Sequence, residues 1–394
     1  MARGRIASKV QKKLNFLCFG EPFTGKSTFA LQFAYMHNED GTPMKILYID
    51  CESGGADVYL DELEANGVDL SNIYMIYTQS LGEVLDYIDK VKNGEEFLML
   101  DDEGEETDEV VLDANGNPFH PDVIIVDGVT VLHTAVQQGL LEFSKKRARV
   151  RADSNGLIGD EKLVANEGSG LEIRDYGNIK FKAANLCLAL LGTGVHSLIT
   201  CRETDEKVSV KGANNQFTSV PTGKKIPDGF KDLDYNTHTV IRFYRDEDDN
   251  VVADVQKDRT GVHPKEKLVD PTLLDWQVVI DGNKGKTNFV LKNNLDTAVA
   301  TEQEIYSAEV MSNATKSLSK SEMEKEKAKA ASESDNSSSD ITALKAQIKA
   351  VISKMNPVDK QAAQTKLKEN NLPTAFNKVN DAGILQQILA TITE

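Results

Sequence analysis

The sequence is poor in the features that mark membrane, secreted and metal-binding proteins. No apolar run approaches the length of a bilayer-spanning helix, and the basic segment 1–13 lacks the apolar centre of a signal peptide. Only four cysteines and six histidines occur in 394 residues, and none of them shows the paired spacing of metal ligands. The cysteines lie in apolar patterns that are typical of buried free thiols. We therefore expect a soluble protein of a reducing, cytoplasmic compartment, with no membrane contact.

Aromatic residues are also scarce, at 6% of the chain, and acidic residues outnumber basic ones, which gives a formal net charge of −17. Such a charge keeps a protein soluble and argues against a histone-like affinity for nucleic acid over the whole surface, but it leaves room for a local basic groove. The chain is longer than an ordinary single domain. We expect a core of about 250 to 300 residues with further segments attached to it.

One stretch near the start carries a specific motif. It follows the apolar run 14–19, precedes the helical pattern 27–37, and consists of Gly20, Glu21, Pro22, Phe23, Thr24, Gly25, Lys26, Ser27 and Thr28. Glycines at the first and sixth positions, between a strand and a helix, form the pattern of a phosphate-binding loop. The alternative is a glycine-rich surface turn, which fits this strand and helix context less well.

The residue types of this loop suit a nucleoside triphosphate. The glycines let the backbone curl so that its N–H groups point at the phosphates, and the following helix adds the positive end of its dipole. Lys26 supplies a point charge for the terminal phosphates, and the Ser27 hydroxyl is a ligand for Mg²⁺. The sequence therefore predicts that the chain binds ATP together with Mg²⁺.

Short strands alternate with helical patterns after this loop. Apolar strands are expected at 45–50, 73–77 and 122–128, and their alternation with helices predicts an α/β fold with a mostly parallel sheet covered on both faces. Segment 95–121 interrupts the alternation with an acidic cluster between apolar runs, and we interpret it as an inserted acidic hairpin. The strand 122–128 ends in Asp127, a carboxylate placed to orient the water ligands of Mg²⁺.

The last quarter of the chain differs in composition. Segment 301–340 is rich in Ser, Lys, Glu and Ala with few large apolar residues, which predicts a flexible charged linker. Segment 341–394 regains apolar residues at helical spacing and predicts a small helical module, a candidate site for a protein partner. We thus divide the chain into a basic arm at 1–13, a core at 14–300, the linker and the module.

These motifs together resemble those of RecA-like P-loop ATPases, in particular the phage-encoded kind that acts in single-strand annealing and recombination. The phosphate loop, Glu52, Asp127 and the strand ending at 200–202 occur in the order and approximate spacing of a RecA core. Residues 257–261, Lys-Asp-Arg-Thr-Gly, are similar to the Lys-Asn-Arg-Phe-Gly box of RadA-type proteins. The resemblance covers 14–261 and implies a RecA-like NTPase core with ATPase activity, in the cytoplasm of the bacterial host if the gene is a phage gene.

The resemblance implies roles for residues near the nucleotide. Glu52 takes the place of the glutamate that activates the attacking water; the alternative is a helix N-cap cluster in which Asp50 or Ser53 caps the helix. Arg202 or Thr200 stands where the RecA core has the glutamine that senses the γ-phosphate. The glutamate role is favoured, because a phosphate loop without a positioned carboxylate would be an incomplete hydrolytic site.

The Lys-Asp-Arg-Thr-Gly box implies a contribution from a neighbouring subunit. In the family it reaches across an interface toward the neighbour's nucleotide, so Lys257 and Arg259 would stabilise transition-state charge in trans. The protein would then act as a homo-oligomer, a ring or a filament. A solvated basic turn is the alternative, because this box has Asp for Asn and Thr for Phe.

The family places its DNA-binding loops in two segments, which correspond here to the polar stretches 144–177 and 202–236. The first contains five cations within seven residues, a cluster suited to the backbone phosphates of single-stranded DNA: Lys145, Lys146, Arg147, Arg149 and Arg151. The alternative is that this run is the solvated end of a helix that begins near Val129. Candidates for stacking on bases are Tyr176, Phe217 and Phe230.

Three functions remain open at this point. The first is a DNA-dependent ATPase that assembles on single strands in recombination, annealing or replication. The second is a nucleotide-gated DNA-binding or loader protein with little turnover, whose carboxyl-terminal module recruits a partner. The third is a helicase core, which we rank last because only about a dozen residues precede the first strand.

Overall fold

The structure is a computed structural model that describes most of the chain in two compact units. The units span Met1–Val299 and Ala300–Glu394. The described residues are 6–101, 104, 106–211, 217–291, 298–308, 341, 343–353, 355, 357–370, 372–374, 376–379 and 381–393.

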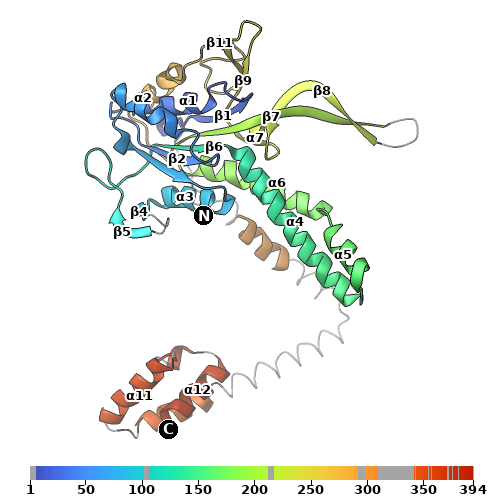
Figure 1. Cartoon of the computed structure of the whole chain (residues 1–394). Coiled ribbons are helices and arrows are strands. Elements are labelled where there is room, and N and C mark those ends of the chain that lie inside the picture. Colours follow the sequence, from blue (N-terminus) through green and yellow to red (C-terminus); the bar gives the residue numbers. More distant parts are fainter. Residues whose placement is uncertain are drawn as a thin grey trace. The chain divides into compact units, whose positions relative to one another are not determined.

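Strands and helices alternate along the first unit (Figure 1). Its strands are β1 Asn15–Gly20, β2 Ile46–Asp50, β3 Ile73–Tyr77, β4 Leu98–Leu100, β5 Glu106–Val110, β6 Val123–Asp127, β7 His196–Lys211, β8 Phe217–Asp228, β9 Thr239–Arg245, β10 Val251–Asp258 and β11 Lys267–Val269. Its helices are α1 Lys26–Leu31, α2 Leu60–Ala65, α3 Leu81–Asn93, α4 Val129–Ser154, α5 Gly159–Glu167, α6 Ile173–Gly192, α7 Leu233–Asn236 and α8 Gln277–Asp281.

The central sheet is mostly parallel, as the sequence predicts. Its strand order is β11-β10-β9-β1-β7-β6-β2-β3, and β8 is an additional strand that pairs with β7 outside this linear order. From β9 to β3 in this order, each strand is parallel to the next. The pairs β9 with β10, β10 with β11, and β7 with β8 are antiparallel. β7 therefore lies between β1, which leads into the phosphate loop, and β6, which ends in Asp127. The carboxyl ends of these strands meet at one edge of the sheet.

Helices cover both faces of the sheet, because the strand side chains are apolar on both sides. On β1, Phe16 and Cys18 pack with residues of α1 and α8 on one face, while Leu17 and Phe19 pack with residues of α3, α4 and α6 on the other. Runs of apolar residues buried on both faces are typical of parallel strands between helical layers. The α/β fold class is thereby confirmed.

Segment 144–177 is helical rather than a loop. Helix α4 continues 26 residues from Val129 to Ser154, followed by α5 and the first turns of α6. Together the three helices form a projection that extends from the sheet (Figure 1). The cationic run is therefore the end of the helix that begins at Val129, which was the alternative interpretation of the sequence.

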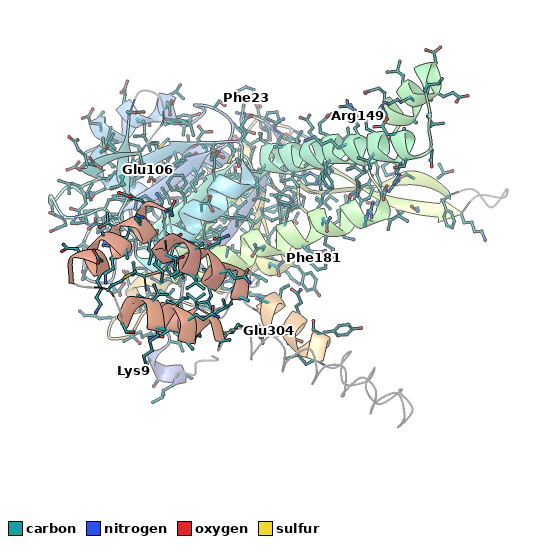
Figure 2. The ribbon with its side chains drawn as sticks, turned by 90° about the horizontal axis from the view of Figure 1, so that it is seen from below. Lys9, Phe23, Glu106, Arg149, Phe181 and Glu304 are labelled. Carbon is teal, nitrogen blue, oxygen red and sulfur yellow. The ribbon has the colours of Figure 1, made fainter. Side chains whose placement is uncertain are left out.

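Segment 202–236 is also regular structure and not a loop. β7 leaves the sheet after Cys201, where its side chains change from buried to mostly exposed, and pairs antiparallel with β8 to form a long hairpin. α7 follows the hairpin. The helical projection and the hairpin extend from the same side of the sheet in both views (Figures 1 and 2).

The second unit contains helices at 341 and 343–353, α11 Pro357–Glu369 and α12 Ala382–Thr393, packed around an apolar core of their own. Residues 298–308 are helical, so the first part of the segment expected to be a linker has regular structure, and 309–340 lie outside the described residues. Among the helices of the described residues, none is long and apolar enough to cross a bilayer.

Candidate nucleotide-binding site

The phosphate loop joins β1 to α1 at the carboxyl edge of the sheet. Gly20 has a φ of 147°, and a Cβ added there would lie 1.9 Å from the carbonyl oxygen of Phe243 on β9, so only glycine fits. Gly25, at a φ of 77°, leads directly into α1. Among the described residues, the amide groups of Phe23, Thr24 and Gly25 meet no hydrogen-bond acceptor. Free amides at the start of a helix are the donors that phosphate oxygens need.

Lys26 is held against the loop that it serves. Its ammonium group donates to the carbonyl oxygens of Glu21 and Gly20 at 2.5 and 3.4 Å. Burial lowers the pKa of Lys26, and the nearby carboxylates of Glu52 and Asp127 oppose this shift. A bound phosphate would add negative charge where burial now penalises the ammonium, which favours the charged lysine.

Asp127 is nearly buried and is held by hydroxyl groups from both neighbouring strands. Tyr48 on β2 donates to its Oδ2 at 2.5 Å, and Thr200 on β7 donates to its Oδ1 while accepting from the amide of Gly128 at 2.8 Å. The side chain of Ser27, at the start of α1, lies near the Tyr48 phenol. The predicted metal residues Ser27 and Asp127 therefore both lie close to this phenol.

A Mg²⁺ ion fits this donor set only together with a nucleotide. Within the described residues, no group of three or more His, Cys, Asp or Glu side chains is placed to hold a metal ion by itself. Mg²⁺ is usually bound by one or two protein oxygens plus substrate phosphates and water. The Ser27 hydroxyl and the Asp127 carboxylate supply that kind of incomplete ligand set.

Glu52 lies at the same edge, and its neighbour Asp50 performs the local capping. Asp50 accepts from the amides of Glu52 and Gly54 at 2.7 and 2.9 Å, so it stabilises the turn after β2. Of the two side chains in the predicted N-cap cluster, Asp50 thus has the structural role. The Glu52 carboxylate instead points across Gly128, where an added Cβ would lie 2.4 Å from the Glu52 Cγ.

Arg202 is the direct partner of Glu52. Its Nε and Nη2 atoms lie 3.2 and 3.0 Å from Oε1 of Glu52. Arg202 stands beside Gly20 in the register of β7 with β1, at the point where the hairpin leaves the sheet. Thr200, the alternative candidate for sensing the γ-phosphate, already uses its hydroxyl for Asp127 and Gly128.

Comparisons with known proteins leave the function of this chain open. Neither a protein-family model nor a curated protein matches the chain. Among solved structures, a KaiC-like protein from the hyperthermophilic archaeon Pyrococcus horikoshii is similar, with 16% sequence identity and a TM-score of 0.34 over 66% of this chain and 89% of that chain. So distant a likeness says nothing about activity. The chain has a mostly parallel α/β fold, and its function has to be derived from its own side chains.

The Lys-Asp-Arg-Thr-Gly box lies at the opposite edge of the sheet from the phosphate loop. β10 runs antiparallel to β9, so Asp258 pairs with Thr239 at the start of β9, whereas Gly20 pairs with Phe243 near its end. The box therefore cannot serve the phosphate loop of its own chain. Contact with a nucleotide would require a second copy.

The two cations of the box differ in their surroundings. Lys257 donates to three carbonyl oxygens at the end of α7, those of Asp234, Tyr235 and Thr237. Arg259 is exposed, and its guanidinium has no ion-pair partner within the described residues. Asp258, which replaces the family's asparagine, organises the turn by accepting from the amides of Thr260, Val262 and His263. Lys257 thus has a structural role here, and Arg259 is the available cation.

Four of the five predicted DNA-binding cations join the helices of the projection. Their ion pairs are Lys145 with Glu142 and Glu167, Arg147 with Asp175, Arg149 with Glu167, and Arg151 with Glu172. Arg147 is mostly buried in its pair, whereas Arg149 and Arg151 stay more than half exposed, and Arg149 is visible at the rim of α4 (Figure 2). Lys146 is exposed with no ion-pair partner among the described residues.

The hairpin carries a basic surface that was not predicted from the sequence of 202–236. Lys207, Ser209 and Lys211 alternate with Val208 and Val210 along β7. Alternate residues of a strand share a face, so the lysines lie on one face and the valines on the other. Lys211 pairs with Phe217, which is 71% exposed, whereas Phe230, another stacking candidate, is buried.

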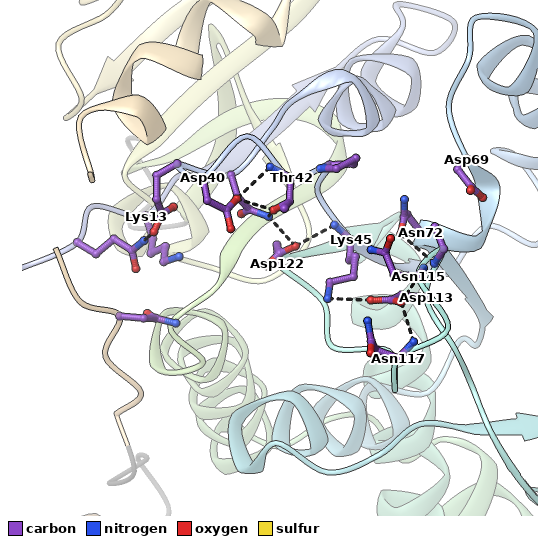
Figure 3. Close-up of a pocket in the computed structure, with 16 residues that line it drawn as sticks. Lys13, Asp40, Thr42, Lys45, Asp69, Asn72, Asp113, Asn115, Asn117 and Asp122 are labelled. Atoms are coloured by element: carbon purple, nitrogen blue, oxygen red, sulfur yellow. Dashed lines mark hydrogen bonds and ion pairs between the residues drawn. The ribbon is translucent and has the colours of Figure 1, made fainter. Parts of the chain in front are cut away.

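A cavity of about 650 Å³ lies away from this site, at the amino ends of the parallel strands (Figure 3). Its polar groups bind one another: Lys45 pairs with Asp113 at 3.3 Å, and Asp122 accepts from Asn38 and from the amide of Lys45. The cavity lies at the edge opposite the phosphate loop. It is therefore separate from the nucleotide site.

Proposed function

We propose that this chain is an ATP-binding and ATP-hydrolysing RecA-like protein that acts on single-stranded DNA, in the annealing, recombination or replication of a phage. The observation that carries the proposal is the meeting of Lys26, Ser27, Asp127 and Glu52 at one edge of the sheet. Loop amides and Lys26 would hold the phosphates, and Ser27 and Asp127 would hold Mg²⁺, which neutralises charge on the β- and γ-phosphates when bound.

Glu52 would activate the water. In the reaction, a water oxygen bonds to the γ-phosphorus, the bond from that phosphorus to the β,γ-bridging oxygen breaks, and a proton of the water passes to the Glu52 carboxylate. The products are ADP and phosphate. Arg202, beside Gly20, would exchange its contact with Glu52 for the γ-phosphate, and Arg259 of a second copy would add positive charge from across an interface.

Single-stranded DNA is the proposed partner of the two extensions. Lys207, Lys211 and Phe217 on one face of the hairpin combine charge with an exposed aromatic ring, the chemistry that binds single strands without reading their sequence. Lys146, Arg149 and Arg151 on the projection offer further cations, and their exposed ion pairs are weak enough for phosphates to compete.

The alternative is a nucleotide-gated binding or loader protein with little turnover. The ion pair between Arg202 and Glu52 favours it, because the guanidinium occupies the carboxylate that would have to position the water. Binding of a fluorescent oligonucleotide, measured by anisotropy with and without ATP and at several salt concentrations, tests the DNA partner. We expect tighter, salt-dependent binding with ATP, and ring or filament assemblies in electron micrographs. Affinity that does not depend on salt, with monomers in the micrographs, would contradict the proposal.

A further inference from the structure

The phenol of Tyr48 on β2 binds the carboxylate of Asp127 on the neighbouring strand β6. Tyr48 is in the middle of β2, its side chain is fully buried, and its hydroxyl donates to Oδ2 of Asp127 at 2.5 Å. The Ser27 side chain at the start of α1 lies near the same phenol. The Tyr48 hydroxyl thus holds the carboxylate at the end of β6 close to the loop serine.

The register of the sheet produces this arrangement. Tyr48 stands opposite Ile125 on β6, two residues before Asp127. Residues two apart on a strand share a face, so Tyr48 and Asp127 both lie on the face that α1 covers. A diagonal neighbour on the next strand is within reach of a long aromatic side chain. The ring itself packs in the apolar core beneath α1.

We infer that Tyr48 is a positioning residue for Mg²⁺, because its hydroxyl fixes the orientation of the Asp127 carboxylate beside the start of α1. The inference rests on the proposed function. Thr200 holds one oxygen of Asp127 and Tyr48 holds the other, so the carboxylate cannot rotate freely. Partners that orient metal ligands in this way change metal affinity by about 10- to 100-fold when they are removed.

The test is the Tyr48→Phe variant of the full chain, with Tyr74→Phe as a matched control. Tyr74 is on the adjacent strand β3, and its hydroxyl also makes a hydrogen bond, to the carbonyl of Leu98 at 3.0 Å, but away from the phosphate loop. Two quantities are measured: ATP affinity in EDTA, and the free Mg²⁺ concentration that gives half of the thermal stabilisation at a fixed ATP concentration. For Tyr48→Phe we expect unchanged ATP affinity in EDTA and a Mg²⁺ midpoint raised about 10- to 100-fold.

Three outcomes separate the possibilities. A Mg²⁺ midpoint in Tyr48→Phe equal to that of wild type and Tyr74→Phe overturns the inference, as does an equal loss of ATP affinity with and without Mg²⁺, which would indicate a distorted loop. Failure of wild type to bind ATP contradicts the proposed function as well. If Tyr48→Phe does not fold, 3-fluorotyrosine at position 48 keeps the hydroxyl, and its ¹⁹F resonance should shift when Mg²⁺ is added to the ATP complex. An unchanged resonance would overturn the inference.

Discussion

Arg202 contacts the proposed catalytic carboxylate with two nitrogens, because its Nε and Nη2 both donate to Oε1 of Glu52, at 3.2 and 3.0 Å. Arg202 is the residue at which β7 leaves the sheet and enters the hairpin. The hydroxyl of Thr130 pins this point by accepting from the Arg202 amide and donating to the carbonyl of Asp228 on β8. The root of the proposed DNA-binding hairpin is therefore in direct contact with the proposed catalytic carboxylate.

Replacing Arg202 by glutamine should affect activity far more than stability. Arg202 and Glu52 are 62% and 40% exposed, so their ion pair contributes at most about 1 kcal/mol to folding. Removing a group that stabilises transition-state charge costs about 100-fold in rate. Hydrolysis rates and thermal unfolding of Arg202→Gln are compared with those of Arg174→Gln, which loses a similarly exposed ion pair to Glu172. Wild-type hydrolysis by Arg202→Gln would contradict a role for this residue.

Gly128 should be required for the position of Glu52. An alanine there places its Cβ 2.4 Å from the Glu52 Cγ, at a φ of 93°. We expect Gly128→Ala to bind ATP but to lose most of its hydrolysis, because the carboxylate is displaced. Gly156→Ala is the control, since it also has a positive φ, of 69°, but nothing lies within 4 Å of the added Cβ. Both variants bear the left-handed backbone cost of about 1 to 2 kcal/mol. Equal activities of the two would show that Glu52 was not displaced.

The lysines of the hairpin should contribute to the salt dependence of DNA binding. Each lysine that contacts a phosphate changes the slope of log affinity against log salt concentration by about one. The double variant Lys207→Gln/Lys211→Gln is therefore expected to bind single-stranded DNA more weakly and with a slope shallower by about two. The control removes two charges elsewhere, at Lys284 and Lys286. A slope that falls equally in both variants would point to net charge and not to the hairpin.

His263 should make stability depend on pH near neutrality. Its ring nitrogens lie 2.8 and 2.9 Å from the carboxylates of Glu266 and Asp275. Burial lowers the pKa of His263, but its hydrogen bonds to these carboxylates outweigh burial and raise it. The stabilisation is complete below the unfolded pKa of about 6.5 and is lost as the pH rises through the higher folded value.

The difference in melting temperature between wild type and His263→Gln measures this effect. It should be largest in mildly acidic solution and should shrink as the pH rises through the raised pKa of folded His263. A difference that stays constant across this range would mean that the charge of His263 does not contribute. ATP affinity of His263→Gln serves as the check that the variant is folded.

The secondary-structure predictions that the structure confirms were those with local signals. The strand, glycine loop and helix around Lys26 form a short continuous pattern, and Asp127 ends a fully apolar strand, so both could be placed from the sequence. Because parallel strands end at the same edge, their meeting followed from the fold class. The role of Tyr48 could not be predicted, since it depends on the register between β2 and β6.

The prediction of loops for the two long polar segments is wrong, because polar residues can also form helices and strands. In 144–177 the helices are joined through ion pairs such as Arg147 with Asp175, which leave no apolar periodicity to detect. In 202–236 a signal was present: Lys207, Val208, Ser209, Val210 and Lys211 alternate strictly between polar and apolar, which is the pattern of a strand.

The rate of ATP hydrolysis with and without single-stranded DNA, for wild type and for Glu52→Gln, tests the central claim most directly. We predict that single-stranded DNA increases hydrolysis by wild type, and that Glu52→Gln binds ATP but shows neither the basal nor the stimulated rate, because no carboxylate accepts the proton of the water. Hydrolysis by Glu52→Gln at the wild-type rate, or wild-type hydrolysis that single-stranded DNA leaves unchanged, would contradict the account.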